Sequence, residues 1–204
     1  IEQVCAYDAY VGASLRLIRA FGLRRKESVM LRPNACIVPF ESTGLAECER
    51  QADQYVWIRQ GAKNGRQRFV PLNTPRRLAA VEHAQTVASG PDAHLGNPNQ
   101  DLKRNLRRFG YVLEKFGITV SKLGITAHGL RHEALIEEFV VQTGHQPPVR
   151  GGTDVPAEAE KAARLAVSRL AGHSRPRAST AYLGQSAVMR RKPALRASGA
   201  SEVA

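Results

Sequence analysis

The sequence has few cysteines and no long apolar run. Its three cysteines, Cys5, Cys36 and Cys48, form no C-x-x-C pair. An odd count without a regular framework argues against a disulfide-stapled secreted domain. No Cys/His cluster has the spacing of zinc ligands. No stretch approaches the roughly 20 apolar residues that cross a bilayer, and no signal-peptide pattern opens the chain. We therefore expect a protein of the reducing cytoplasm with ordinary thiols and no membrane partner.

Acidic residues are also scarce relative to basic ones. Eighteen Asp and Glu stand against thirty Lys and Arg, which gives a formal net charge of +12 over 204 residues. The length suits one domain, and a hydrophobic fraction of 43% is enough for a globular core. A domain this basic is typical of a protein that binds a polyanion such as nucleic acid. A basic surface that serves only solubility is the alternative.

Apolar residues at three- and four-residue steps predict that most of the chain is helical. The clearest case is residues 100–116, where Leu102, Leu106, Phe109, Leu113 and Phe116 form one stripe. Helices are expected over residues 2–20, 25–31, 75–88 (with Leu78, Val81 and Gln85 on one line), 100–116, 129–142 and 156–170, and a last short helix capped by Ser174 carries Tyr182.

A different period predicts a small sheet near the start of the chain. Residues 35–40, 55–59 and 66–70 are strand-like, and residues 61–65 between the last two have turn chemistry. The expected fold is therefore α+β and mainly helical, with a small antiparallel sheet in a single domain. Residues 143–155 contain two prolines and three glycines and predict a flexible loop. Residues 187–204 are basic and lack an apolar face, so we expect a flexible tail.

The helix over residues 100–116 is strongly basic outside its apolar stripe. This surface is either an ordinary solvated face or a surface that follows DNA phosphates, and the sequence favours neither. The basic side chains that we consider as DNA-backbone contacts are Lys103, Arg104, Arg107 and Arg108 on this helix, and Arg175 and Arg177 near the end of the chain.

Four short polar stretches carry the chemistry that the sequence suggests. Each alone has an ordinary explanation, such as a surface ion pair, a solvated turn lysine or a helix cap, and a single motif match is weak. Their order and spacing make them specific as a set. They are Gly22-Leu23-Arg24 with Glu27, Lys63 followed by residues 66–72, the run His128-Gly129-Leu130-Arg131-His132, and Gly172-His173 with Tyr182 nine residues downstream.

These stretches resemble the catalytic domain of the tyrosine recombinases, the lambda-type phage integrase family. The family pattern is T-G-L-R-x-x-E, a hairpin Lys before R-x-V-P-L, then H-x-L-R-H, L-G-H and a Tyr nine residues after that His. The resemblance runs from about residue 13 to residue 184. Phe21 and Ala127 stand where the family often has Thr and Pro. The segment between Arg131 and His173 is longer than usual, with residues 143–155 as the insertion.

The resemblance implies a domain organisation. It predicts the DNA breaking–rejoining fold over residues 1–186, followed by the basic tail. The family usually carries an upstream helical domain that helps to clamp the duplex, and this domain is absent from the sequence. Because the chain begins at Ile1 without a Met, we expect a piece of a longer protein.

The resemblance also implies a reaction, site-specific cutting and rejoining of DNA by transesterification. Tyr182 attacks phosphorus to form a 3′-phosphotyrosyl link, and no metal, ATP or other cofactor is required. Arg24 and Arg131 are expected to bind the phosphate, and His173 to donate a hydrogen bond to a phosphate oxygen. Lys63 is the expected general acid and His128 the expected base. Glu27 is expected to orient Arg24 or a histidine, and His132 to support the site.

Two other functions fit the same residues. One is a basic DNA-binding module without catalysis, and the other is a type IB topoisomerase-like enzyme that relaxes supercoils. The partners implied by the resemblance are double-stranded DNA, further copies in a tetramer on paired DNA sites, and accessory DNA-bending proteins. The implied location is the cytoplasm, on the nucleoid. Target sequence, and attack within or across subunits, are left open.

Overall fold

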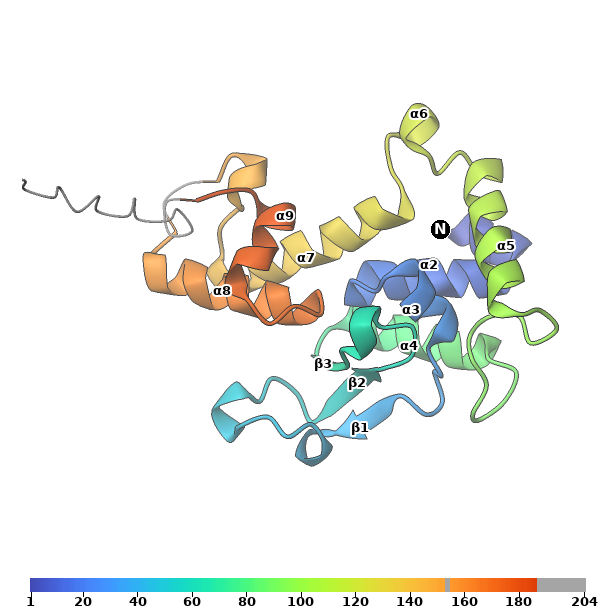
Figure 1. Cartoon of the computed structure of the whole chain (residues 1–204), viewed down its shortest axis with the longest axis horizontal. Helices are drawn as coiled ribbons and strands as arrows, with labels where there is room; N and C mark the ends of the chain where they lie inside the picture. The colour runs from blue at the N-terminus through green and yellow to red at the C-terminus, as the bar shows by residue number, and fades with distance from the viewer. Residues whose placement is uncertain (153–154, 187–204) are drawn as a thin grey trace, which may run out of the picture.

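The computed structural model describes residues 1–152 and 155–186, and the expected tail over 187–204 lies outside these residues. The chain is mainly helical with a small antiparallel sheet, so the α+β fold class is confirmed (Figure 1). Its elements are α1 (Glu2–Tyr7), α2 (Ala9–Phe21), α3 (Arg25–Met30), β1 (Ile37–Pro39), β2 (Gln54–Ile58), β3 (Arg68–Pro71), α4 (Pro75–Val87), α5 (Leu102–Lys115), α6 (Val120–Leu123), α7 (Ala127–Thr143), α8 (Ala157–Leu170) and α9 (Thr180–Leu183).

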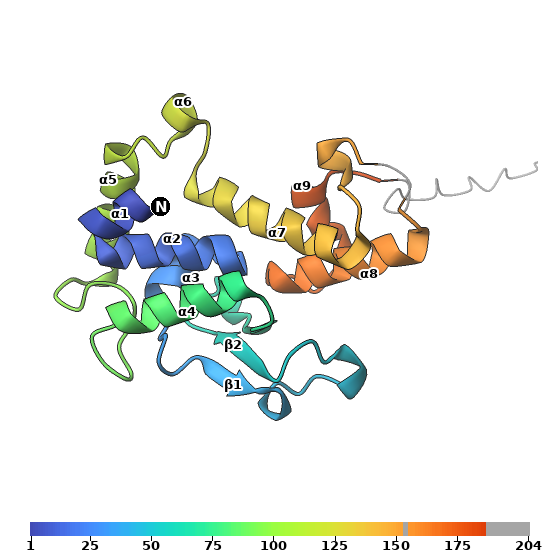
Figure 2. The same cartoon turned by 180° about the vertical axis from the view of Figure 1, so that it is seen from behind.

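The helix α2 is the centre of the core. Its Leu15, Leu17, Ile18 and Phe21 are fully buried, because it packs against α1, α3, α4 and α7. The helix α7 packs against both α2 and α8. The helices α8 and α9 lie at the opposite end of the molecule from α5 (Figures 1 and 2). None of the helices within residues 1–152 and 155–186 is long and apolar enough to cross a membrane.

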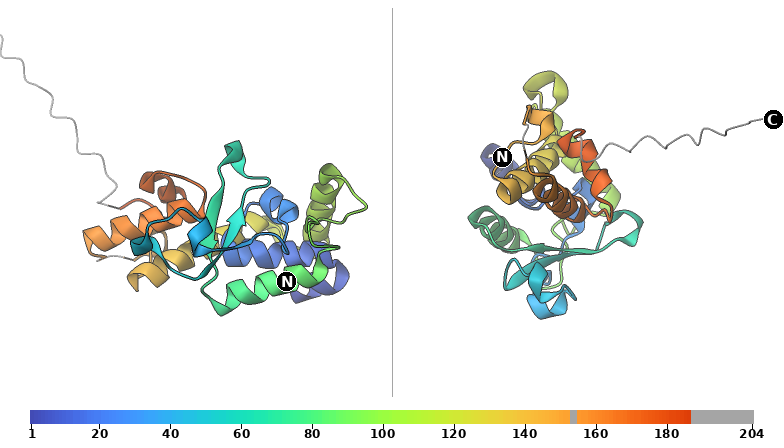
Figure 3. Two further views of the ribbon diagram at one scale, coloured as in Figure 1. Left: turned by 90° about the horizontal axis from the view of Figure 1, so that it is seen from below. Right: turned by 90° about the vertical axis from the view of Figure 1, so that its left-hand side faces the viewer.

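The sheet has the strand order β1-β2-β3, with both pairs antiparallel. Val56 on the central strand pairs with Ile37 on one side and with Val70 on the other. The β2–β3 hairpin projects from the body of the molecule (Figure 3). Its turn lies against α3, since a Cβ on Gly61 would be only 2.9 Å from the carbonyl oxygen of Lys26. This close approach places the hairpin turn, which carries Lys63, beside the start of α3.

Several sequence predictions need correction. The single helix over residues 2–20 is wrong, because Asp8 is extended (φ −148°, ψ 98°) and its side chain caps α2 by accepting from the Val11 N–H. Ser174 is not the cap of the last helix. Pro176 fixes the start of a 3₁₀ turn, η5 (Pro176–Ser179), and α9 follows Ser179 directly. Leu78 is 43% exposed, because the buried face of α4 consists of Arg77, Ala80, Val81 and Ala84.

The expected loop over residues 143–155 is only partly irregular. Its first residue ends α7, and it contains a 3₁₀ turn, η4 (Pro148–Arg150), which contacts α9. Arg150 forms an ion pair with Glu133 on α7, which ties this turn to the helix. Residues 153–154 lie outside the described residues.

Candidate active site

Arg24 and Arg131 meet at one backbone carbonyl, although they lie 107 residues apart in the numbering. Arg24 precedes α3, and Arg131 lies in the second turn of α7. Their Nη2 atoms donate to the carbonyl oxygen of Ala171, at 3.0 and 2.9 Å respectively. Arg131 also donates to the Gly22 carbonyl oxygen. The side chain of Arg24 is 25% exposed, whereas that of Arg131 is 2% exposed.

The turn that places Arg24 follows from its local sequence. Gly22 ends α2 in the left-handed conformation (φ 60°), and Leu23 is buried. Glu27 then accepts the backbone N–H of Arg24 at 2.7 Å and its Nη1 at 2.8 Å. The Glu27 carboxylate therefore caps the start of α3 and also orients the guanidinium of Arg24. Its partner is this arginine and not a histidine.

Glu27 has a second partner on the sheet, Arg68 of β3. Arg68 donates to both carboxylate oxygens of Glu27, at 2.9 and 2.7 Å, and both side chains are buried. Burial alone would raise the pKa of Glu27, but the hydrogen bonds and charge of Arg68, with the Arg24 backbone N–H and charge, lower it to about 2. Arg68 was not among the predicted site residues, and its place in the R-x-V-P-L stretch was the available signal.

Replacing Glu27 should destabilise the fold in a pH-dependent way. Its folded-state pKa of about 2 lies below the usual value of 4.5, so the ionised carboxylate stabilises the protein above about pH 4.5. This contribution is lost as the pH falls from 4.5 through about 2. We expect Glu27→Gln to lower the free energy of unfolding by about 3 kcal/mol near pH 6, and by much less near pH 3.

Urea unfolding of both proteins at the two pH values measures this difference. The exposed Glu47→Gln is the control, because Glu47 pairs only at the surface and should show little effect. A difference between Glu27→Gln and the parent that does not shrink on acidification would contradict the role given to the Glu27 carboxylate.

Tyr182 lies beside Arg131. Its hydroxyl is 3.4 Å from Nη2 of Arg131, at the long end for a hydrogen bond, and its ring centre is 5.7 Å from the Arg131 guanidinium carbon. The side chain is almost fully buried, at 9% exposure. Because α9 carries Tyr182 and α7 carries Arg131, the contact between these two helices sets this separation.

His128 and His132 are one helical turn apart on α7 and touch each other. Their Nε2 atoms are 2.9 Å apart, and the His132 ring meets the edge of the Tyr182 ring at 4.9 Å between centroids. The pKa of each histidine is lowered, chiefly by loss of hydration, and then by neighbouring positive charge that includes Arg131. Partial burial and the nearby positive charge therefore favour the neutral form of both rings.

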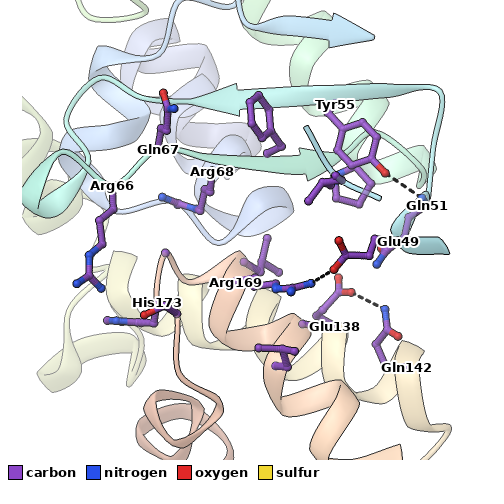
Figure 4. Close-up of a pocket in the computed structure, with 18 of the residues that line it drawn as sticks. Glu49, Gln51, Tyr55, Arg66, Gln67, Arg68, Glu138, Gln142, Arg169 and His173 are labelled. Carbon is purple, nitrogen blue, oxygen red and sulfur yellow. Dashed lines mark hydrogen bonds and ion pairs between the residues drawn. The ribbon is translucent and has the colours of Figure 1, made fainter. Parts of the chain in front are cut away.

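His173 follows α8 and faces the hairpin. Its pKa is lowered by partial burial and by the charges of Arg24, Arg131, Arg66 and Lys63, in that order. Positive charge from both arginines and from the hairpin turn therefore acts on one imidazole. Figure 4 shows Arg66 and His173 side by side at one end of a pocket of about 880 Å³ between the sheet and α8. The exposed Arg66 was not predicted as a site residue.

Gly172 has a steric reason to lack a side chain. Its φ is +76°, and a Cβ there would lie 3.3 Å from Nη1 of Arg68 and 3.4 Å from Nη1 of Arg24. A glycine therefore lets two guanidinium groups approach the backbone just before His173.

The expected DNA-backbone residues separate into different regions. Arg175 and Arg177 are exposed beside α9, close to Tyr182 in the sequence. Lys103, Arg104 and Arg107 are exposed on α5, at the other end of the molecule from α8 and α9 (Figures 1 and 2). Arg108 instead pairs with Asp8 at 2.7 Å and ties α5 to the junction between α1 and α2.

Contacts link four of the six residues predicted as catalytic. Arg24 and Arg131 share the Ala171 carbonyl, Arg131 lies beside Tyr182, and His128 contacts His132, whose ring packs against that of Tyr182. His173 is linked to Arg24, Arg131 and Lys63 by the effect of their charges on its pKa. Among the described residues, no group of three or more His, Cys, Asp or Glu side chains is arranged to hold a metal ion.

Comparison with known proteins identifies the family. Residues 1–135 match the family described as Integrase, and no curated protein matches the chain. The matched segment contains Arg24, Glu27, Lys63 and the run from His128 to His132, and it ends before His173 and Tyr182. The match covers more than half of the chain, so this protein belongs to the integrase family.

Proposed function

We propose that this integrase cuts and rejoins DNA through a covalent link at Tyr182. Membership of the family makes the chain a site-specific DNA recombinase. In the proposed step, the Tyr182 oxygen bonds to phosphorus, the bond from phosphorus to the 5′-oxygen breaks, and a 3′-phosphotyrosyl link and a 5′-hydroxyl result. The 5′-hydroxyl of another strand then attacks the phosphotyrosine, restores the phosphodiester and releases Tyr182.

The observation that carries this proposal is the contact of Tyr182 with Arg131, which shares the Ala171 carbonyl with Arg24. A phosphodiester is negative, and more charge gathers on its non-bridging oxygens in the transition state. The guanidinium groups of Arg24 and Arg131 offer paired donors to such oxygens. Glu27 and the Ala171 carbonyl hold both groups before substrate arrives. Donors fixed in this way stabilise developing charge without reorganisation.

Two proton transfers complete the proposal. His128 takes the proton of the Tyr182 hydroxyl, and His132, at 2.9 Å, fixes the orientation and tautomer of the His128 ring. Lys63, exposed at the tip of the hairpin, protonates the leaving 5′-oxygen. His173 donates a hydrogen bond to a phosphate oxygen. Because an ester is exchanged for an ester, the reaction needs no nucleotide cofactor.

The assembly around this reaction is also a proposal. Residues 1–186 act as the catalytic domain on double-stranded DNA, with Arg175 and Arg177 as backbone contacts beside α9. Recombination between two sites calls for self-association, for which we propose a tetramer on paired sites, aided by DNA-bending proteins. The proposed location, the cytoplasmic nucleoid, follows from the DNA substrate.

A nicked DNA of the cognate site tests the chemistry. Cleavage beside the nick releases a short fragment, so the covalent intermediate cannot reverse and accumulates. We expect a protein–DNA adduct that survives denaturant, and mass spectrometry of its peptides should locate the link on Tyr182. A chain that binds the site and never forms the adduct is a DNA-binding module, and one that relaxes supercoils without joining two sites is topoisomerase-like.

A further inference from the structure

A second buried ion pair, in addition to that of Glu27 and Arg68, lies on α8. Arg164 is 0% exposed, and its Nε donates to Glu160 Oε1 at 2.7 Å on the same helix. The other two nitrogens of its guanidinium contact residues outside α8. Nη1 is 3.5 Å from Ser179 Oγ, and Nη2 donates to the carbonyl oxygen of Gly184 at 3.0 Å. Ser179 directly precedes α9 and Gly184 directly follows it, so one guanidinium reaches both ends of the helix that carries Tyr182.

The helix α9 needs such support from outside. It has only four residues, and a single helical turn is unstable by itself in water. The far end of α9 is also tightly packed, since a Cβ on Gly184 would lie 3.0 Å from the backbone nitrogen of Val149 in η4. The place of the Tyr182 hydroxyl therefore depends on what grips the two ends of α9.

Stability alone does not account for a charged pair at this position. Removing a guanidinium and a carboxylate from water costs several kcal/mol per ion, and apolar residues of similar volume often stabilise a protein equally well or better. An arginine offers what apolar residues lack, namely donors in a rigid planar fork. Glu160 fixes one edge of this fork, and the opposite edge then fixes Ser179 and Gly184.

We propose that Arg164, oriented by Glu160, is a positioning residue that fixes α9 and thereby holds Tyr182 beside Arg131. The proposal rests on the proposed role of Tyr182 as the nucleophile. It assigns Arg164 no contact with DNA, because the side chain is fully buried.

The double variant Glu160→Gln/Arg164→Met removes the grip and leaves no unpaired buried charge. We expect its adduct to form at least tenfold more slowly at saturating DNA, because a displacement of 1 Å in a reacting group can cost about 10²-fold in rate. Its affinity for the cognate DNA should stay within about twofold of the parent chain. Arg164→Lys, which keeps the charge but loses the fork, should lie between the two in rate.

The matched control is Glu2→Gln/Arg16→Met. It removes another arginine–glutamate pair, which joins α1 to α2 at the opposite end of the molecule from α8 and α9 (Figures 1 and 2). It should leave the adduct rate within about twofold of the parent.

The outcomes separate the two proposals. If the parent chain forms no adduct, the proposed chemistry fails. If the parent reacts and both Arg164 variants react equally fast, only the positioning role is overturned. It is also overturned if rate, DNA affinity and unfolding midpoint fall together in both variants, because a purely structural pair would lower all three.

Discussion

Tyr182→Phe should abolish the denaturant-stable protein–DNA adduct while DNA affinity stays within about twofold of the parent chain. The substitution removes one oxygen, and with it the only atom of this side chain that can bond to phosphorus. The fold should lose little stability, because the contact from Arg131 is long, at 3.4 Å. Arg131 still donates to the carbonyl oxygens of Gly22 and Ala171. A denaturing gel with end-labelled nicked DNA measures the adduct, and a mobility-shift assay measures binding.

Tyr55→Phe is the control for this experiment. Tyr55 is on β2, and its hydroxyl accepts a hydrogen bond from the backbone N–H of Gln51. The variant should keep full adduct formation. An adduct that persists in Tyr182→Phe would place the nucleophile elsewhere and remove the basis of the proposed reaction.

Tyr182→Phe also shows whether the nucleophile acts within its own chain. Tyr182 and Arg131 are in contact in one chain here, so we expect attack in cis. Arg131→Lys has an intact tyrosine and a damaged pocket, and Tyr182→Phe has the reverse. A mixture of the two should therefore form no more adduct than each protein alone. Restored activity in the mixture would show that the tyrosine crosses to a neighbouring subunit.

Arg24→Ala should slow adduct formation by about 10²- to 10³-fold, the usual loss when one preorganised donor to a developing oxyanion is removed. Arg24 is the more accessible of the two arginines, and it is oriented by Glu27 and by the Ala171 carbonyl. Its substitution should therefore affect the rate at saturating DNA more than the affinity. A time course of adduct formation at several DNA concentrations separates the two quantities.

Arg25→Ala is a closely matched control for Arg24→Ala. Arg25 is the next residue, is exposed, and its loss changes the net charge by the same amount. Any general loss of attraction to the DNA polyanion should affect both variants equally and depend on salt. If Arg25→Ala slows the reaction as much as Arg24→Ala does, Arg24 contributes only to overall charge.

Much of the fold was predictable from local pattern. The apolar stripe of residues 100–116 and the turn chemistry of residues 61–65 correspond to α5 and to the hairpin turn, because both depend on near neighbours in sequence. Two of the errors arose where one residue decided a boundary. Asp8 divides the first helix by capping α2, and Pro176 rather than Ser174 sets the start of the last helical segment.

The amino-acid sequence by itself determined the family and the α+β class, through the identity, order and spacing of a few polar side chains within a helical pattern. Tertiary structure alone decided which buried charges meet. Glu27 pairs with Arg68 across 41 residues, and Arg164 grips both ends of α9. Arg108, a candidate for DNA by its position on a basic helix, instead pairs with Asp8. A guanidinium binds whichever acceptors packing brings within about 3 Å, and no local spacing encodes contacts between residues so far apart in the chain.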